Sequence, residues 1–384
     1  MTHGLDTVLK RTQLLFFSRY FRVANMIKVL VLSKYDKKAA SARQRFFQFA
    51  DLFVEQGIQL KFSPFFCDDY LRERFSTGKA KPWSVVSAIS RRLYSVLTAT
   101  KFDFVIVHCE LIPYCPAWIE RILLSRVSYI YDYDDAIFHQ YDEHKWSIVK
   151  FLLGNKISRV IAGAKAVMAG SQYLAEYAIQ YNNTVKLIPT VVDFARYKGD
   201  LEVIPLKPFT VGWIGSPSTT EYLVEVSEPL RKLAAEGQIR LIAIGAKNFS
   251  IVGVDVEIRA WSEDKEVQDL MECDVGIMPL PDKNWAKGKC AFKLIQYMAC
   301  GLPVIASPVG ANNYVVTDGA GLLAIGQHEW VEALQKLRDD SVLRRTMGCA
   351  GRAVVAAKYS KNSVAPVIIE LIRSLHKENS QCGV

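Results

Sequence analysis

KGKCAFKLIQYMACGLPVIASPVG, which occupies residues 287–310, is the stretch of sequence that decides the fold. Its apolar residues recur at helical spacing over 292–300, and Gly301 follows where a helix C-cap favours a left-handed residue. Pro303 cannot prolong a helix, so the apolar residues 304–306 predict a short buried strand. A helix, a glycine stop and a buried strand in this order indicate one α/β repeat of a doubly wound sheet.

Two lysines accompany the start of the predicted helix. Lys289 lies just before it, and Lys293 lies in its first turn. Because a helix N-terminus carries free N–H groups and a partial positive charge, the added ammonium groups predict an anion site that would suit a pyrophosphate. The alternative is that both lysines are solvated surface charges and that the helix only packs against the sheet.

The run 292–310 resembles the nucleotide-sugar site of retaining glycosyltransferases of the GT-B architecture, the group-1, family-four type. That family typically shows two glutamates eight residues apart, the second of which opens E-A-M-A-C-G-x-P-V-I. This chain has Gly288 and Gln296 at those two positions. An amide can still hydrogen-bond a ribose diol, whereas the glycine offers no contact to the donor sugar. The resemblance implies that Lys289, Lys293 and Gln296 bind the donor and that Lys293 also acts in catalysis.

The resemblance implies an α/β fold with two Rossmann-like domains that face each other across a cleft. A length of 384 residues also favours two domains of similar size. We expect a basic amphipathic extension, an N-terminal acceptor domain, a linker, a C-terminal donor-binding domain and a final helix that crosses back to the N-terminal domain. The boundaries expected for these five parts are 1–25, 26–194, 195–208, 209–360 and 361–384.

Two predicted strands of the first domain end in residues that carry chemistry. His108 closes the apolar run FVIVH, and the run YIYDYDD places Asp134 and Asp135 at the end of the next strand. Open α/β sheets bind ligands at the carboxyl ends of their strands. The family has a histidine at such a strand end, so we expect His108 and Asp134 to act in catalysis and Asp135 to contact the acceptor. The alternatives are a structural histidine and a helix-capping Asp135.

The turn after the first strand, residues 34–43, lacks the GxGxxG of a dinucleotide site, which argues against a nicotinamide enzyme. We expect Arg43 in this turn to contact the acceptor or a phosphate, with helix capping or surface charge as the alternative. The strand-end aspartates could suggest a metal. The resemblance implies a reaction without a metal and without a cofactor other than the nucleoside diphosphate sugar itself, so no metal ligand is assigned.

The second domain opens with FTVGWIGSP at 209–217, which matches the strand and glycine turn that approach the donor phosphates in the family. Only backbone and a small side chain fit beside a pyrophosphate, so Gly215 and Ser216 are expected to bind the donor. Trp261 is expected to stack on the nucleobase, and the alternative is an ordinary packing tryptophan.

The composition narrows the compartment and the partners. A net charge of +9 favours a phosphorylated ligand or an anionic membrane surface, and no nucleic-acid-binding motif accompanies it. Eight cysteines without a CxxC pair are typical of a reducing cytoplasm. No segment has the apolar length to cross a bilayer. Residues 1–25 alternate aromatic and basic residues, which predicts peripheral contact with the inner membrane face, unless they are only a loosely held extension.

The sequence therefore predicts a cytoplasmic hexosyltransferase that moves a sugar from a nucleoside diphosphate sugar to an acceptor hydroxyl with retention of configuration. The acceptor would be a saccharide or a lipid-linked intermediate of polysaccharide or glycolipid assembly. One alternative is a nucleotide-sugar epimerase or phosphorylase of the same fold. The other is a non-catalytic nucleotide-sugar-binding protein, which the absence of both glutamates suggests.

Overall fold

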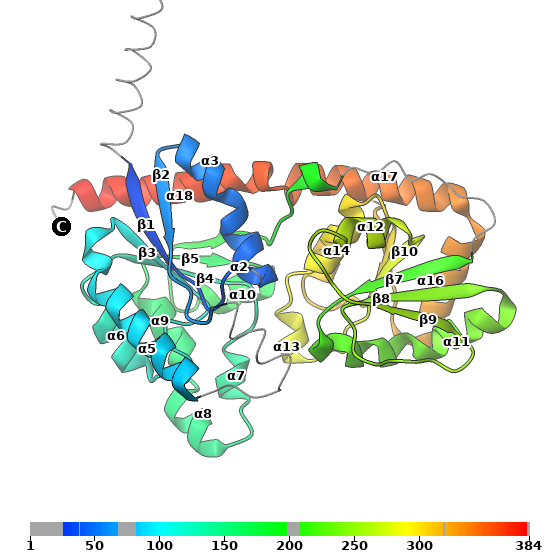
Figure 1. Cartoon of the computed structure of the whole chain (residues 1–384), viewed down its shortest axis with the longest axis horizontal. Helices are drawn as coiled ribbons and strands as arrows, with labels where there is room; N and C mark the ends of the chain where they lie inside the picture. Colours follow the sequence, from blue (N-terminus) through cyan, green and yellow to red (C-terminus); the bar gives the residue numbers. More distant parts are fainter. Residues whose placement is uncertain (1–25, 38, 68–81, 198–207, 318, 382–384) are drawn as a thin grey trace, which may run out of the picture. The chain divides into compact units, whose positions relative to one another are not determined.

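The computed structural model describes residues 26–37, 39–67, 82–197, 208–317 and 319–381. The expected extension 1–25 and most of the expected linker lie outside the described residues. Contacts group the chain into two units, which Figure 1 shows with the elements labelled. The first unit contains Met1–Asp132, Asn155–Val167 and Ala365–Val384, and the second contains Tyr133–Gly154 and Met168–Val364.

The strands form two six-stranded sheets, and the recorded pairings between neighbouring strands are parallel. The first sheet has the order β2-β1-β3-β4-β5-β6, and the second has the order β12-β11-β10-β7-β8-β9. The strands of the first sheet are β1 (Ile27–Leu32), β2 (Ile58–Phe62), β3 (Phe104–His108), β4 (Tyr129–Tyr133), β5 (Ala166–Ala169) and β6 (Val185–Leu187). Those of the second are β7 (Phe209–Ile214), β8 (Ile239–Ile244), β9 (Asp255–Arg259), β10 (Val275–Met278), β11 (Val304–Ala306) and β12 (Gly321–Leu323). Two parallel sheets of this kind confirm the predicted α/β class with two Rossmann-like sheets.

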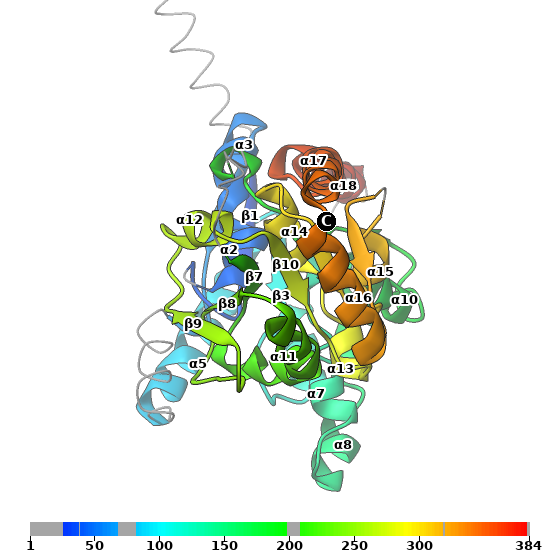
Figure 2. The ribbon, with the colours of Figure 1, turned by 90° about the vertical axis from the view of Figure 1, so that its right-hand side faces the viewer.

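Helices connect most of the successive parallel strands, whereas β8 and β9 are joined by residues 245–254 without a helix. Before β7 the α-helices are α2 (Ala40–Arg45), α3 (Ala50–Glu55), α5 (Pro82–Leu97), α6 (Ala117–Leu124), α7 (His139–Asp142), α8 (Ser147–Leu153), α9 (Lys156–Gly163) and α10 (Gln172–Ala178). After β7 they are α11 (Ser227–Glu236), α12 (Glu266–Met271), α13 (Asn284–Lys287), α14 (Phe292–Ala299), α15 (Asn312–Val315), α16 (Gly326–Asp339), α17 (Ser341–Lys358) and α18 (Lys361–Gln381). Short 3-10 helices are η1 (Phe47–Phe49), η2 (Ala99–Lys101), η3 (Phe194–Arg196) and η4 (Pro217–Val226). Figure 2 shows α11 and α16, which pack against each other beside the second sheet.

The predicted helix, glycine stop and strand are confirmed in the second unit. α14 spans Phe292–Ala299, and Gly301 has a φ of 78°, which a residue without a Cβ adopts without strain. The N–H of Leu302 donates to the carbonyl oxygen of Tyr297 over 3.0 Å and closes the helix end. β11 follows at Val304–Ala306.

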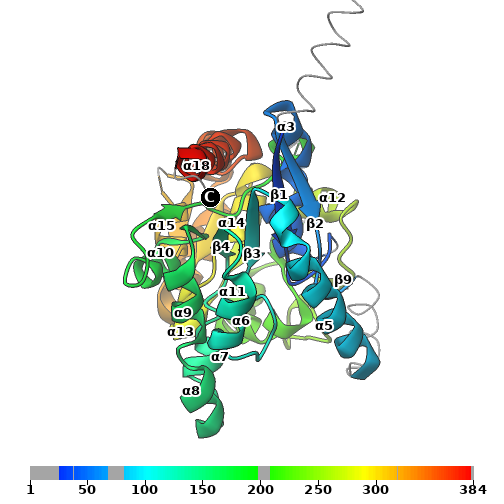
Figure 3. The same ribbon diagram turned by 90° about the vertical axis from the view of Figure 1, so that its left-hand side faces the viewer.

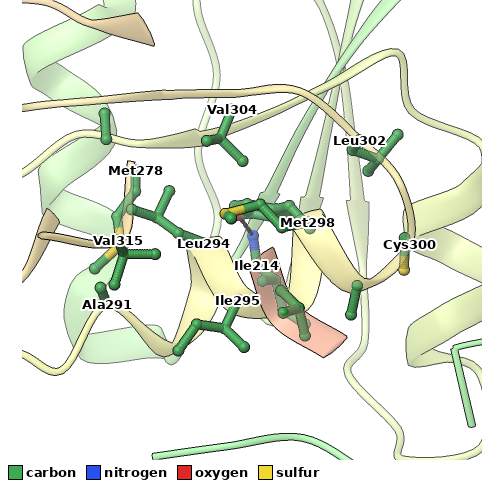
Figure 4. Packing of buried hydrophobic residues seen from close by; sticks show 14 of the residues in the cluster. Ile214, Met278, Ala291, Leu294, Ile295, Met298, Cys300, Leu302, Val304 and Val315 are labelled. Carbon is green, nitrogen blue, oxygen red and sulfur yellow. Dashed lines mark hydrogen bonds between the residues drawn. The ribbon is translucent and has the colours of Figure 1, made fainter. Parts of the chain in front are cut away.

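α14 is buried along most of its length. The six residues from Leu294 to Ala299 are all buried, and Figure 4 shows part of the cluster in which they pack. Each fully buried aliphatic side chain contributes about 1.5–3 kcal/mol relative to an exposed one. The Tyr297 hydroxyl accepts from the Ile214 N–H over 2.9 Å and donates to the Ile277 carbonyl oxygen over 3.2 Å. Packing and hydrogen bonds therefore fix α14 against the sheet, and with it the position of its N-terminus.

The C-terminal helix α18 contributes to the first unit from Ala365 onward. Arg373 donates to the Gln56 carbonyl oxygen over 2.7 Å, and Asn379 donates to the Ser128 hydroxyl over 3.1 Å. Figures 1 and 3 show α18 at the edge of this unit that also carries α3. Among the described residues, no helix combines the length and the apolar character that a bilayer-spanning helix needs.

A buried ion-pair network lies in the first unit. Lys156 at the start of α9 places its Nζ 2.9 Å from a Glu110 carboxylate oxygen and 3.2 Å from a Glu120 oxygen. The same ammonium donates to the carbonyl oxygen of Ile112 over 2.8 Å. The other Glu110 oxygen lies 3.0 Å from Nζ of Lys34. This network ties the loop after β3 to α6 and α9.

Candidate functional site

The start of α14 has a strained backbone. Ala291, directly before the helix, has a φ of 53°, and this left-handed conformation costs a residue with a Cβ about 1–2 kcal/mol. The N–H groups of Leu294 and Ile295 donate to the Ala291 carbonyl oxygen. The described backbone offers no acceptor to the N–H groups of Phe292 and Lys293. Two first-turn donors are therefore available to an anion, in a segment whose conformation is imposed by its surroundings.

Lys293 lies in this first turn and has few polar neighbours. Its Nζ lies 4.3 Å from the ring centroid of Trp213 and donates to Oγ1 of Thr219 over 3.5 Å. None of the described carboxylates pairs with it. Burial, with the nearby charge of Lys289, lowers the pKa of Lys293 to about 7. A bound anion would supply the negative partner that this ammonium group lacks among the described residues.

Gly215 follows β7 directly and lies beside Lys293; its expected contact with the donor phosphates stays a prediction. A Cβ added at Gly215 would lie 2.3 Å from Cη2 of Trp213 and 2.7 Å from Nζ of Lys293. The next residue, Ser216, begins η4, and its N–H donates to Oγ1 of Thr219 over 3.2 Å. A glycine at position 215 therefore leaves room for the side chains of Trp213 and Lys293.

The second lysine of the predicted anion site has a partner. Nζ of Lys289 lies 2.7 Å from the Asp135 carboxylate, and the Lys289 side chain is 24% exposed. Burial lowers the pKa of Lys289, but the charge of Asp135 more than offsets it, so the pKa is raised. The Cys290 thiol donates to the Asp134 carbonyl oxygen over 3.0 Å. The structure thus joins a residue expected to bind donor to one expected to bind acceptor.

Gly288, where the resembled family has its first glutamate, packs against Ala136. A Cβ at Gly288 would lie 2.3 Å from the Ala136 Cβ and 2.7 Å from the Ala136 backbone nitrogen. Because backbone cannot move aside cheaply, this arrangement excludes any side chain at the position. The missing glutamate therefore has a steric reason within the second unit.

We expect Gly288→Glu to destabilise the protein by about 1–3 kcal/mol rather than to improve donor binding, because the added side chain meets the Ala136 backbone. Gly237→Ala is the matched control, since a Cβ at Gly237 would meet nothing within 4 Å and its φ is 178°. Thermal unfolding of both variants beside the wild type measures the difference. A Gly288→Glu variant with the wild-type melting temperature would show that the contact with Ala136 gives way.

Trp261 and Gln296 are both linked to the Glu266 carboxylate, Trp261 directly and Gln296 through Tyr197, and Glu266 was not among the residues expected at the site. The Trp261 indole N–H donates to Glu266 over 2.8 Å, and the Tyr197 hydroxyl donates to the other Glu266 oxygen over 2.9 Å. Gln296 is 3% exposed and hydrogen-bonds Tyr197. Burial, with the charge of Glu266, raises the pKa of Tyr197. Trp261 is 36% exposed, so its ring is held in place while part of its surface stays accessible.

The place of Glu266 in the sequence gives no reason to single it out. It is the first residue of α12, a short helix that follows the end of β9, yet only 2% of it is exposed. The favourable interaction with the helix dipole usually explains an acidic residue in the first turn of a helix. Only the packing of α12 shows that this one is buried and accepts two hydrogen bonds.

His108 ends β3 in the first unit and is 2% exposed. Its Nδ1 lies 2.8 Å from the Asp132 carboxylate, and its Nε2 lies 2.8 Å from the Ser41 hydroxyl. Asp132 also pairs with Arg45. Burial raises the pKa of Asp132, but Arg45 and His108 together outweigh it, so the pKa is lowered. An ionised Asp132 accepts the Nδ1 proton, so Nε2 is left as the nitrogen that accepts from a hydroxyl. Asp132, Arg45 and Ser41 were not among the residues assigned to the site from the sequence.

Arg43 lies in α2 of the first unit and is 8% exposed. This burial rules out the alternative of a simple surface charge. The residues expected at the site are thus divided between the units: Arg43 and His108 belong to the first, whereas Asp134, Asp135 and the six donor residues belong to the second. Their assigned roles stay predictions, as does the absence of a metal.

The second sheet lies within a segment that resembles a known family. Residues 208–340 match the family described as glycosyl transferases group 1. This segment therefore resembles a group 1 glycosyltransferase domain. A GDP-mannose-dependent monoacylated alpha-(1-6)-phosphatidylinositol monomannoside mannosyltransferase from Corynebacterium glutamicum is 35% identical over 82 residues, 21% of this chain and 22% of the relative. A D-inositol 3-phosphate glycosyltransferase from Pseudarthrobacter chlorophenolicus is 23% identical over 246 residues, 55% of this chain and 56% of the relative.

The chain thus spans between about a fifth and just over half of the length of these relatives. Among solved structures, Anabaena HepE in complex with UDP-glucose has a TM-score of 0.63 and 17% identity, over 92% of this chain and 99% of HepE. The fold is that of the GT-B glycosyltransferases.

The segment that matches the group 1 glycosyltransferase family contains every residue that was expected to bind the donor. These residues are Gly215, Ser216, Trp261, Lys289, Lys293 and Gln296. The other expected site residues, Arg43, His108, Asp134 and Asp135, precede this segment.

Proposed function

We propose that this protein is a glycosyltransferase of the hexosyltransferase type, which moves a sugar from a nucleoside diphosphate sugar to an acceptor hydroxyl. The observation that carries the proposal is the buried ammonium group of Lys293, which has no described carboxylate partner and lies beside two available N–H groups. A diphosphate matches this arrangement in charge and in its number of acceptor oxygens. The match to the group 1 family and the UDP-glucose in the HepE complex support the same ligand class.

The chemical step breaks the bond between the sugar and the diphosphate, and the acceptor oxygen forms the new bond. The diphosphate gains negative charge as the sugar departs, so Lys293 and the first-turn N–H groups of α14 stabilise the transition state more than the bound donor. Retention of configuration is proposed from the family resemblance, with attack on the face that the diphosphate leaves. The departing phosphate oxygen then takes the proton of the acceptor hydroxyl, so no separate base is needed.

The rest of the donor site is proposed from the second unit. Trp261, held by Glu266, would stack on the nucleobase. The Gln296 amide, which hydrogen-bonds Tyr197, would bind the ribose diol. Lys289 would contribute its charge from the pair with Asp135. Gly215 and Ser216 would border the phosphates.

The acceptor is proposed to be a saccharide or a lipid-linked saccharide in polysaccharide or glycolipid assembly. The names of the two relatives, which concern a phosphatidylinositol mannoside and an inositol phosphate, support a hydroxyl-rich acceptor. Arg43 and Asp135 are proposed to contact it, and His108 and Asp134 to position its hydroxyl. His108 is suited to this because its Nδ1 contact with Asp132 makes Nε2 a hydrogen-bond acceptor for a hydroxyl, as its contact with Ser41 illustrates. The proposed place of action is the cytoplasm, at or near the inner membrane face.

A panel of nucleotide sugars tests the proposal in two steps. Thermal shift with UDP, GDP, ADP and CDP should identify one base that stabilises the protein, since a ligand that binds only the folded state raises the melting temperature. The corresponding nucleotide sugars should then be hydrolysed slowly without acceptor and consumed faster with saccharide acceptors. Binding without turnover would indicate a nucleotide-sugar-binding protein, and release of an epimerised sugar would indicate an epimerase. A chain that none of the four diphosphates stabilises would contradict the proposed donor site.

A further inference from the structure

α8, in the second unit, exposes a group of large apolar side chains. Ile148, Phe151 and Leu152 are 62%, 86% and 62% exposed, and Trp146 at the N-cap is 60% exposed. Residues three and four positions apart share a helix face, so the first three lie together. A cluster of this size on one short helix is unusual for a surface that faces only water. We refer to these four side chains as the α8 tip.

The opposite side of the α7–α8 hairpin is anchored in the second unit. Leu153 is 7% exposed. His139 in α7 places Nε2 2.8 Å from the Tyr173 hydroxyl, and the neighbouring Phe138 stacks on Tyr177 with 3.7 Å between ring centroids. Figures 2 and 3 show α7 leading into α8. The exposure of the tip is therefore not the result of a loosely attached helix.

Two cations accompany the apolar tip. Lys145 lies next to Trp146, with its Nζ 5.4 Å from the ring centroid, and Lys150 lies within α8 and is exposed. Neither lysine pairs with a carboxylate of the described residues. Exposed aromatic and aliphatic side chains with unpaired lysines match a surface that is apolar inside and anionic outside.

The size of the tip distinguishes a bilayer from a second copy of the chain. Four side chains of this size offer on the order of 500 Å² of apolar surface. A standard protein–protein interface needs about 800 Å² from each partner. A single amphipathic helix suffices for a membrane interface, where its apolar face enters about 5–10 Å into the boundary between headgroups and acyl chains.

We propose that the α8 tip docks on an anionic lipid bilayer, with Phe151, Ile148 and Leu152 among the acyl chains and Lys145 and Lys150 at the lipid phosphates. Trp146 then lies at the level of the headgroups, where tryptophan is favoured. This surface is separate from residues 1–25, to which the sequence alone pointed. Vesicle binding needs neither donor nor acceptor, so its result is independent of the proposed sugar transfer.

The test is co-sedimentation of the full chain with phosphatidylcholine vesicles that contain about a third of phosphatidylglycerol, beside pure phosphatidylcholine vesicles. The double variant Ile148→Ser with Phe151→Ser should bind the anionic vesicles at least about tenfold more weakly than the wild type. The double variant Lys145→Glu with Lys150→Glu should lose the preference for anionic vesicles and the sensitivity to salt. Val252→Ser is the matched control, because Val252 is 87% exposed in the same unit but stands outside the tip.

Vesicle binding by the serine double variant that equals wild-type binding would overturn the proposal. This holds if the wild type binds through residues 1–25, and it also holds if the wild type does not bind vesicles. Molar mass by light scattering tests the alternative that a second copy of the chain covers the α8 tip. A wild-type dimer that the serine substitutions convert to a monomer would assign the tip to a second copy and would also overturn the proposal. Unchanged nucleotide binding by both double variants is expected, and it confirms that each variant is folded.

Discussion

Lys293→Ala should lower turnover of the nucleotide sugar at least about 100-fold, because it removes a charge that acts where negative charge develops in the transition state. Affinity for the nucleoside diphosphate should fall as well, since the same ammonium group contacts the ground-state diphosphate. Lys293→Arg should recover little, because the wider guanidinium fork does not fit between Trp213 and Thr219. Steady-state kinetics with calorimetric binding of the diphosphate measure both effects.

The pH dependence of donor binding supplies a second readout for Lys293. Its pKa in the free protein is about 7, and a bound diphosphate favours the charged form. Above pH 7 binding must therefore take up a proton, so affinity should fall by up to about tenfold per pH unit. A nucleotide sugar is the proper probe, because its diphosphate has no terminal group that titrates near neutrality. Lys293→Ala should remove this slope.

Two controls separate the role of Lys293 from a general disturbance. Lys287→Ala removes a nearby lysine whose partner is the exposed Asp282, and it should leave turnover within about twofold. Lys293→Met should fold at least as stably as the wild type, because it removes a buried charge without a carboxylate partner. Equal diphosphate affinities and equal rates for wild type and Lys293→Ala would show that the donor phosphates bind elsewhere.

Lys156→Met should destabilise the protein by about 3–5 kcal/mol at pH 8, the largest stability effect that we expect from a single substitution. The Lys156 ammonium is the shared partner of Glu110 and Glu120, and the side chains of all three are at most 1% exposed. Removing it leaves Glu120 buried with the Ile112 N–H but without a cation, and leaves Glu110 with Lys34 as its remaining cation. Chemical denaturation of the two proteins measures the difference. Lys165→Met, at an exposed position of the same unit, should change stability by less than about 0.5 kcal/mol.

The cost of Lys156→Met should shrink as the pH falls. Burial, only partly offset by Lys156, raises the pKa of Glu120 to about 7. A raised carboxyl pKa means that the folded state binds more protons, so the stability contributed by neutral Glu120 is present at low pH and is lost as the pH rises through 7. Without Lys156 the charged form is still less favourable, which makes the loss above pH 7 steeper. Adding Glu120→Gln to Lys156→Met should recover part of the stability at pH 8, and a double variant no more stable than the single one would contradict the network.

The secondary structure of the decisive stretch was predictable from sequence because its signals are local. Apolar spacing gave the helix now seen as α14, Gly301 gave its end, and Pro303 separated it from β11. Each of these signals acts through the backbone conformation of one residue or through the spacing of neighbours. The same holds for the buried strands, whose apolar runs predicted parallel sheets. The lysines at the start of α14 were likewise placed by helical register alone.

The environment of each site residue was decided only by the tertiary structure. Both lysines were expected to face the donor, yet Lys289 pairs with Asp135, which is 154 positions away, whereas Lys293 meets Trp213 and Thr219. Glu266 was overlooked because its burial depends on contacts with side chains distant in the sequence.

Residue types and spacing thus determined the parallel α/β fold and placed two lysines at the start of a helix, where the donor site stays a proposal. Packing decided which of the two lysines is left without a carboxylate, why a glycine stands at position 288 and which histidine nitrogen can accept a proton. The physical reason is that a pKa, a steric limit and a tautomer depend on distances of a few ångströms between residues far apart in the chain. Local sequence patterns do not encode those distances.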